Sequence, residues 1–403
     1  MTRSASSARP GRRRSGTPPL RVVADALEPE DDELDARVAA YTAAADADNT
    51  VRTYTWAWNR FENWCETTGH TALPASVRTI NRYMVSAADD PDKPVSRSTL
   101  EVLRAAIAWK HAGAGLADPT ADPRARKTRR GIRKAKVEAG ETDNRAPAAV
   151  AADVRAMVDT ARMQATTWRR QVAARRDIAL ILLTYDFGRR RSEAVGLKIG
   201  DLDIVTDNAE QEPRLRIRLR GGKTHQDSTR YKYRPRGSGD GHTCPWCALA
   251  RWIEVLNAAD DAAVAARGQG QDAVTDAVSI AVQRLLRRDT SDPGQHCCTD
   301  GNWLTGRALA FLFRPVSNGG VPHGPDSALS GRSVGTIVNA RALAAGIGPR
   351  RGHSLRGGVA TQMFDDGARV EDVMALLDHA LAETSLRYDR NREQRSAQVN
   401  TGL

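Results

Sequence analysis

The sequence has few cysteines and lacks a long hydrophobic run. No stretch approaches the about 18 consecutive apolar residues that a membrane-spanning helix needs. The basic start of the chain, MTRSASSARPGRRRSGTPPL, has no apolar segment behind it, which predicts that no secretory signal is present. Five cysteines, an odd number among 403 residues, do not resemble a disulfide framework and fit a reducing compartment. Together these absences predict a cytoplasmic protein.

Acidic residues are too few to balance the basic ones. Lysine and arginine number 60 against 49 aspartates and glutamates, which leaves a formal net charge of +11 and a pI near 9.8. This excess predicts a polyanionic partner, and nucleic acid is a better candidate than an acidic membrane surface. Hydrophobic residues make up 40%, as in globular proteins, and the length predicts two or three domains with cores of their own.

Composition divides the chain into segments. The first residues are rich in Arg, Ser and Pro and then in acidic residues, so they have little to bury and are predicted to be disordered. Helical periodicity follows, interrupted by one polar stretch of linker composition. The predicted segments are a tail at 1–32, a helical DNA-binding domain at 33–138, a linker at 139–147, and a second domain at 148–403 that includes an insertion at about 257–300 and a tail at 391–403.

The first domain is predicted to be all helical. The stretch NTVRTYTWAWNRFENWC begins with Asn49 as a candidate N-cap. Further helices are expected within 74–88 and 96–115, the second closing on a glycine C-cap signal. Four side chains at helical spacing in the first helix are predicted to be buried: Tyr54, Trp58, Phe61 and Cys65.

A cluster of cations follows in the stretch RARKTRRGIRKAKVE. A run of charge is most often the solvated face of a helix, but the acidic residues that usually balance such a face are missing here. Cations that neutralise phosphates release counterions and so favour binding to DNA. The stretch therefore predicts contacts with the DNA backbone through these residues: Arg124, Arg126, Lys127, Arg129, Arg130, Arg133, Lys134 and Lys136.

The second domain is predicted to be mainly helical with a small antiparallel sheet. In RLRIRLRGGKTHQDSTRYKYRP, apolar and basic residues alternate and then meet Gly221 and Gly222, which predicts a hairpin with one basic face. The RGGKT segment is not a nucleotide-binding loop, because that loop needs a glycine where this chain has Ile217. Lys223 is better interpreted as a cation held at the hairpin tip.

Cysteine and histidine gather in two short stretches, HTCPWC and HCC. They offer enough ligand types for a zinc site: His242, Cys244, Cys247, His296, Cys297 and Cys298. However, only one CxxC pair has the usual spacing, its mate lies about fifty residues away, and two adjacent cysteines fit one tetrahedral ion poorly. We therefore predict buried or free thiols and no metal or other cofactor.

Two further stretches concentrate groups that bind oxyanions. In GHSLRGG, His353 and Arg356 are three residues apart and would lie on one face of a helix, an arrangement that suits a phosphate or an internal structural link. In GRRRSEAVGL, three arginines precede Glu193 at the end of an apolar helix. Since consecutive helical residues point in different directions, at most one or two of these arginines can face the same site.

Taken together, these motifs resemble those of the tyrosine recombinase, or phage integrase, family. The resemblance covers roughly residues 35–390. It implies a helical core-binding domain followed by an α+β catalytic domain. The catalytic residues that it implies, in chain order, are Arg190, Lys223, His353, Arg356, His379 and the nucleophile Tyr388, with Glu193 in a supporting position.

The resemblance also implies a mechanism. Tyr388 would attack a DNA phosphate, His353 would accept or orient its proton, and Lys223 would protonate the leaving 5′ oxygen. Arg190 and Arg356 would stabilise the transition state, with a hydrogen bond from His379. The product would be a 3′-phosphotyrosyl link. The partners implied are double-stranded DNA with specific recombination sites, further copies of the chain in a tetramer, and an accessory directionality or DNA-bending protein.

Two positions depart from the family pattern. Arg189 stands where a hydrophobic residue is usual, and Asp378 stands where glycine usually precedes the second histidine. Nine residues of unbroken helix would turn His379 and Tyr388 to opposite sides. We therefore predict a break within residues 380–385, with Thr384 or Ser385 near the start of the next helix.

Several functions share these features. The preferred one is a site-specific recombinase or integrase of a mobile element, acting in the cytoplasm at the nucleoid. A DNA-relaxing enzyme of the type IB topoisomerase kind would use the same chemistry without a site requirement. A DNA-binding protein that has lost catalysis and a zinc-dependent nucleic-acid module are the alternatives from other classes.

Overall fold

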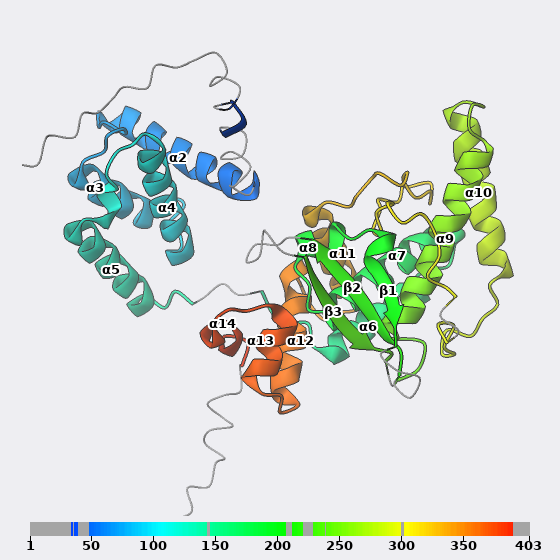
Figure 1. The fold of residues 1–403 in the computed structure, drawn as a ribbon. Helices are drawn as coiled ribbons and strands as arrows, with labels where there is room; N and C mark the ends of the chain where they lie inside the picture. Colours follow the sequence, from blue (N-terminus) through cyan, green and yellow to red (C-terminus); the bar gives the residue numbers. More distant parts are fainter. Residues whose placement is uncertain are drawn as a thin grey trace, which may run out of the picture. The chain divides into compact units, whose positions relative to one another are not determined.

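The computed structural model describes residues 34, 36–38, 48–142, 146–206, 212–220, 229–237, 239–299 and 302–389. The chain forms two compact units, Met1–Thr142 and Asp143–Leu403 (Figure 1). The predicted tails at 1–32 and 391–403 and the turn at Gly221 and Gly222 lie outside the described residues. No helix among those described is long and apolar enough to cross a membrane.

The first unit consists of helices. They are α2 (Asp48–Thr68), α3 (Val77–Ala88), α4 (Arg97–Gly113), a 3-10 turn η1 (Pro119–Ala121) and α5 (Pro123–Glu138). Serine hydroxyls begin α3 and α4, because Ser76 accepts from the backbone N–H of Thr79 and Ser96 from that of Thr99. The helices predicted within 74–88 and 96–115 are thus confirmed. Asn49 lies inside α2, so its prediction as the N-cap was wrong.

The core of the first unit is built on aromatic side chains. Trp58, Phe61 and Cys65 are buried at helical spacing along α2, and Tyr54 packs against this core partly buried. The Phe61 ring lies 4.9 Å from that of Tyr83, centroid to centroid. Such ring pairs add to the free energy gained by removing the side chains from water. The helical prediction for this segment is confirmed.

The second unit is mainly helical. Its helices are α6 (Ala151–Met163), α7 (Trp168–Asp186), α8 (Arg191–Val195), η2 (Ile199–Asp201), α9 (Pro245–Ala265), α10 (Gln271–Arg288), α11 (Gly331–Ala344), α12 (Gly352–Asp365), α13 (Val370–Leu377) and α14 (Ala382–Leu386). Figure 1 shows α12, α13 and α14 gathered on one side of this unit. The buried faces of α7 and α9 share the main core with α6 and α11.

A three-stranded antiparallel sheet completes the second unit. Strands β1 (Leu202–Val205), β2 (Arg214–Arg220) and β3 (Thr229–Pro235) lie in that order, with Leu215 opposite Ile204 and Arg234. In β2 the apolar residues at alternate positions are buried in the main core, and the arginines between them point away from it. The predicted fold class, mainly helical with a small antiparallel sheet, is confirmed.

The segment predicted as an insertion is not separate at its start. Residue 257 lies inside α9, and Ala259 and Asp260 beyond it are still buried. Asp260 accepts two hydrogen bonds from the fully buried Arg314, at 2.7 and 3.0 Å. The segment therefore begins as part of the core and continues into α10, which packs along α9 (Figure 1).

Candidate active site

The turn between α7 and α8, which precedes the three consecutive arginines, depends on Gly188. Helix α7 ends because Gly188 adopts a left-handed conformation (φ +60°), and the N–H of Arg189 then reaches back to the carbonyl of Thr184. A side chain at position 188 would also collide with Leu377, since its Cβ would lie 2.6 Å from Cδ2. Glycine is therefore required where the chain enters the site.

Arg190 is held by Glu193 in the first turn of α8. Its Nη1 lies 2.7 Å from Glu193 Oε1, while Glu193 Oε2 accepts the backbone N–H of Arg190 at 3.1 Å. Burial opposes ionisation of Glu193, but the charges of Arg189 and Arg190 keep the pKa of this carboxyl below its usual value. Glu193 thus stays charged and fixes the guanidinium of Arg190.

Helix α12 carries His353 and Arg356 one turn apart, as predicted. Arg356 is buried, and its guanidinium donates to the carbonyls of Gly188 and Leu377. Burial, followed by repulsion from Arg190 and Arg189, lowers the pKa of Arg356 to about 10, so the group remains charged at neutral pH. The carbonyl contacts tie α12 both to the turn after α7 and to the end of α13.

The chain reverses at Asp378, directly before His379. Asp378 caps α13 in the left-handed conformation (φ 54°), which aspartate adopts more readily than most residues. Helix α14 begins at Ala382, with Leu381 as its N-cap. His379 and Tyr388 are therefore not joined by one unbroken helix, and Thr384 lies near the start of α14, as predicted. The preceding helix ends earlier than the predicted break, at Asp378.

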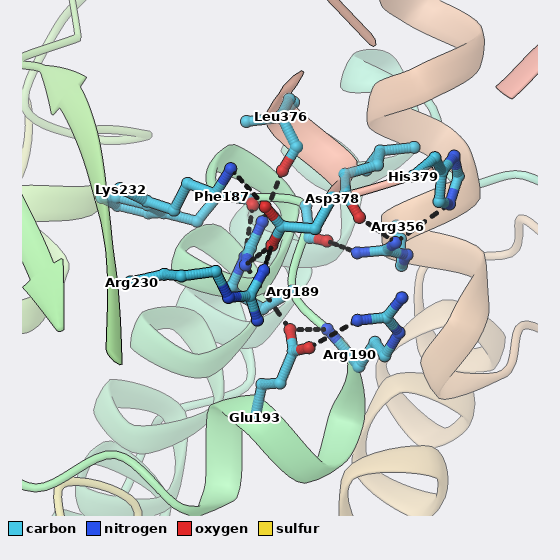
Figure 2. Close-up of polar contacts among 12 residues, drawn as sticks. Phe187, Arg189, Arg190, Glu193, Arg230, Lys232, Arg356, Leu376, Asp378 and His379 are labelled. Carbon is cyan, nitrogen blue, oxygen red and sulfur yellow. Dashed lines mark hydrogen bonds and ion pairs between the residues drawn. The ribbon is translucent and has the colours of Figure 1, made fainter. Parts of the chain in front are cut away.

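The two departures from the family pattern contact each other. Arg189, which is fully buried, donates from Nη1 to Asp378 Oδ2 at 3.1 Å and also donates to the carbonyls of Phe187 and Leu376. Figure 2 shows the carboxylate of Asp378 among three cations: Arg189 and Arg230 contact its Oδ2 atom, and Lys232 of β3 contacts Oδ1. These cations overcome the effect of burial and lower the pKa of Asp378 to about 2.

His379 bridges Arg356 and α14. Its Nε2 lies 3.1 Å from Arg356 Nη2, and because arginine can only donate, Nε2 is the acceptor. Nδ1 therefore carries the proton and donates to the hydroxyl of Ser385 at 2.9 Å. Burial and the charges of Arg356 and Arg190 lower the pKa of His379 to about 4, so the ring is neutral at pH 7.

The hydroxyl of Tyr388 lies 3.2 Å from His353 Nε2. The tyrosine ring packs against Gly357, where a Cβ atom would stand 3.3 Å from it, and it stacks on His379 with 6.0 Å between the ring centroids. Thr361 donates to the carbonyl of Tyr388 at 3.1 Å. Desolvation and three arginine charges lower the pKa of His353, which leaves its imidazole neutral and able to accept a proton at pH 7.

The structure brings most of the predicted catalytic side chains into one region of the second unit, and Figure 2 shows four of them, Arg190, Glu193, Arg356 and His379. Figure 2 shows the guanidinium of Arg190 beside that of Arg356, and its charge contributes to the lowered pKa values of His353, Arg356 and His379. Lys223 lies outside the described residues. The residues that the structure gathers are Arg190, Glu193, His353, Arg356, His379 and Tyr388.

Sequence reasoning missed the roles of several neighbours. Ser385 fixes the tautomer of His379, and the pairing of Arg189 with Asp378 joins residues far apart in the chain. The signal for the pair was present, because the two positions were the two visible departures from the family pattern. Gly357 could be found only from the structure, since nothing in GHSLRGG shows which glycine faces a ring.

The basic segment forms helix α5 of the first unit, and its cations are not all alike. Contrary to the sequence prediction, acidic partners are present, because Glu101 of α4 lies 3.2 Å from Arg129 and Glu141 lies 3.7 Å from Lys136. Three cations are exposed and form no ion pair with any residue that the structure describes: Arg126, Lys127 and Arg130. Arg124, Arg133 and Lys134 are exposed and have an acidic group within 4.0 Å.

Known proteins offer two informative similarities. The chain is 31% identical over 163 residues to an integrase/recombinase xerD homolog of Selenomonas ruminantium, a match that covers 40% of this chain and 44% of that protein. The chain thus matches less than half the length of this curated relative. No protein-family model matches the chain.

A crystal structure of the XerH site-specific recombinase bound to its palindromic difH substrate, in a post-cleavage complex, shares the fold. Its TM-score is 0.50 at 14% sequence identity, and the alignment covers 87% of this chain and 79% of that one. At this low sequence identity, the structural similarity shows a shared fold and nothing about function. The chain therefore shares its fold with the XerH recombinase and is similar in part of its sequence to the Selenomonas protein.

Proposed function

We propose that this chain is a site-specific DNA recombinase or integrase that cleaves and rejoins duplex DNA through a 3′-phosphotyrosyl intermediate at Tyr388. One observation carries the proposal: the Tyr388 hydroxyl lies 3.2 Å from the neutral His353 imidazole, and Arg356 lies one turn further along the same helix. A nucleophile, a base and a buried cation in one place suit attack on a phosphodiester.

Tyr388 needs activation before it can attack. A free tyrosine has a pKa near 10, so at pH 7 only about one molecule in a thousand is a phenolate, a deficit of about 4 kcal/mol. His353 Nε2 is placed to accept the phenolic proton as the oxygen attacks phosphorus. The ring is neutral because of its low pKa, so a base is available at physiological pH.

Arginine guanidiniums stabilise the charge that develops on the phosphate. Arg190 and Arg356 carry permanent charges and planar donors that match two nonbridging oxygens. The carbonyls around Arg356 and the carboxylate of Glu193 hold these groups in place before DNA arrives. His379, which already contacts Arg356, would share the anion, because a phosphate raises the pKa of a nearby imidazole and favours a protonated, donating Nε2.

Cleavage conserves the energy of the phosphodiester bond. As the bond from Tyr388 Oη to phosphorus forms, the bond to the 5′ oxygen breaks, and we propose that Lys223 donates a proton to that leaving oxygen. The 5′ hydroxyl of another strand then attacks the phosphotyrosyl link and releases Tyr388. One phosphodiester replaces another, so no ATP is consumed.

The partners follow from the same proposal. We propose that the helical domain at 33–138 grips duplex DNA through the exposed cations of α5, while the domain at 148–403 performs the chemistry. A tetramer on DNA, an accessory directionality or DNA-bending protein and a place at the nucleoid in the cytoplasm belong to this proposal. The similarity to a recombinase bound to its DNA substrate and to an integrase/recombinase homolog supports the DNA partner.

A nicked duplex tests the function. Duplexes from the DNA that flanks the gene, nicked beside candidate cleavage sites so that the short product diffuses away, should trap a covalent protein–DNA complex that survives denaturation. Tyr388→Phe should bind the same DNA and trap none. Tight binding without any covalent complex would leave a DNA-binding protein that has lost catalysis.

The topoisomerase alternative makes a different prediction. A type IB relaxing enzyme would relax supercoiled plasmid that lacks the recombination site as fast as plasmid that carries it. We expect covalent complexes only on duplexes that carry the site. Equal relaxation of both plasmids would favour the alternative.

A further inference from the structure

Four metal-binding side chains meet at one end of α9, in a place that the proposed chemistry does not use. Cys244 is the N-cap of α9 and Cys247 lies in its first turn, while His296 and Cys298 come from the loop that follows α10. One ligand atom from each lies within 4.8 Å of all the others. The three thiols are buried and none is in a disulfide.

The distances match those of a tetrahedral zinc centre. With Zn–S bonds of about 2.3 Å and Zn–N bonds of about 2.0 Å, a tetrahedral ion holds its ligand atoms about 3.5 to 3.8 Å apart. Here the sulfur of Cys247 lies 3.4 Å from that of Cys298, and the sulfur of Cys244 lies 3.9 Å from that of Cys298. The Nδ1 atom of His296 lies 3.5 Å from the Cys247 sulfur. A disulfide would need sulfurs about 2.05 Å apart.

His296 is oriented as a ligand. Its Nε2 lies 2.8 Å from the carbonyl oxygen of Gly239, and since a carbonyl only accepts, Nε2 must carry the ring proton. In the neutral ring, Nδ1 then presents its lone pair to the sulfurs of Cys247 and Cys298. A backbone carbonyl that fixes the second nitrogen is a common partner of metal-binding histidine.

Cys297 and Cys298, the adjacent cysteines expected to fit one ion poorly, have different environments. Cys298 is buried in the cluster, whereas Cys297 is exposed. The backbone N–H of Cys297 donates to the sulfur of Cys247 at 3.3 Å, a contact that stabilises a thiolate. Only one of the two thiols therefore competes for the ion.

The backbone frame around the cluster is closely fitted. The N–H of Gly241 donates to the carbonyl of Gly294 at 2.7 Å, and a Cβ atom at position 241 would lie 2.2 Å from the Gln295 oxygen. Only glycine allows the loop before α9 to come this close to the loop after α10. Two segments far apart in the chain are thereby held with their ligands facing each other.

We propose that Cys244, Cys247, His296 and Cys298 bind one structural Zn²⁺ ion. Four protein ligands leave no position for substrate, which is the pattern of structural rather than catalytic sites. The ion would connect the start of α9 to the loop that follows α10, and so stabilise the packing of this helix pair. This proposal replaces the prediction, made from the sequence, of buried or free thiols without a metal.

Metal content of the full-length protein tests the site. The protein should be expressed in zinc-supplemented medium and purified without chelator. Inductively coupled plasma mass spectrometry should then find about one zinc per chain. Cys298→Ser should lose most of that zinc, and Cys297→Ser is the matched control that should keep it. Equal zinc loss in both variants, or a wild type without zinc that takes up none from zinc chloride, would overturn the proposal.

Two measurements on the wild-type protein test the zinc site even if Cys298→Ser fails to fold. Replacing the metal with Co²⁺ should produce the intense visible bands of a tetrahedral thiolate complex. A strong chelator should remove the metal and lower the melting temperature, and zinc chloride should restore it. A spectrum of octahedral Co²⁺, or a Cys244 to Cys298 disulfide found by peptide mass spectrometry of protein kept under anaerobic conditions, would contradict a zinc site.

Discussion

Helix α5 and the candidate active site use the same residue type in opposite ways. On α5 most of the arginines and lysines are exposed, and those that form an ion pair do so with a carboxylate, as Lys134 does with the exposed Glu138. In the active site, Arg189 and Arg356 are buried, and each donates to backbone carbonyls as well as to a side chain. The exposed cations of α5 face solvent, whereas the two buried arginines are each held by several hydrogen bonds.

The contrast separates affinity from chemistry. Exposed cations can neutralise phosphates along the backbone and release counterions, which gives binding that weakens with salt. Buried cations lose most of their hydration and hold a fixed position, which is what stabilisation of a transition state requires. If this division is right, substitutions in the two regions should change different measurements.

The largest effect is expected at Arg356. Arg356→Lys keeps the charge but loses the planar donors, so single-turnover cleavage of the nicked duplex should fall by about 100-fold or more. Affinity for DNA at fixed salt should change much less, because one positive charge is retained. A cleavage rate within about threefold of wild type, in a variant with unchanged melting temperature, would show that Arg356 does not stabilise the transition state.

The pair of Arg189 and Asp378 tests the contrast through stability. Asp378→Gly leaves the buried Arg189 with Glu193, at 3.5 Å, as its one acidic partner among the described residues, and should cost about 3 kcal/mol of unfolding free energy. Arg189→Leu should cost less, because Asp378 keeps Arg230 and Lys232. The double variant should lose less than the sum, with a coupling of about 1 kcal/mol or more in urea unfolding.

The matched control is the exposed pair of Lys134 and Glu138 on α5. The same cycle, with Lys134→Leu and Glu138→Ala, should give a coupling well below about 1 kcal/mol. Additive effects at Arg189 and Asp378, or equal coupling in both cycles, would erase the distinction between the two regions.

The smallest effect is expected on α5 and concerns salt dependence. Replacing Arg126, Lys127 and Arg130 with glutamine should weaken binding to all duplexes and reduce the slope of log affinity against log salt by about 2.7, or about 0.9 for each contact. Cleavage at saturating DNA should not change. Arg129→Gln with Lys136→Gln, at positions already paired with carboxylates, is the control and should reduce the slope less.

Local patterns made much of the fold and the candidate site predictable. The spacing of His353 and Arg356 places them one turn apart on α12, and the alternation in RLRIRLR predicts β2 with one buried face. The family motifs add the order of the catalytic residues along the chain. Such features depend on residues a few positions apart, so they can be read without the tertiary structure.

Contacts between distant segments could not be read in this way. The pairing of Arg189 with Asp378 depends on how the turn after α7 meets the end of α13, and the Cys and His cluster depends on a chain reversal through α9 and α10. The partners of α5 were missed for the same reason, since Glu101 comes from α4. Asp378 was seen as a departure, but only the backbone reversal there explains why α13 ends early.

The central claim is that the hydroxyl oxygen of Tyr388 forms the covalent bond to DNA. Covalent complex trapped on the nicked duplex should be digested with nuclease and protease, and the peptides examined by mass spectrometry. We predict a nucleotide attached through its 3′ phosphate to Tyr388. A nucleotide on another residue, such as Tyr185, or one attached through a 5′ phosphate, would contradict the proposed mechanism.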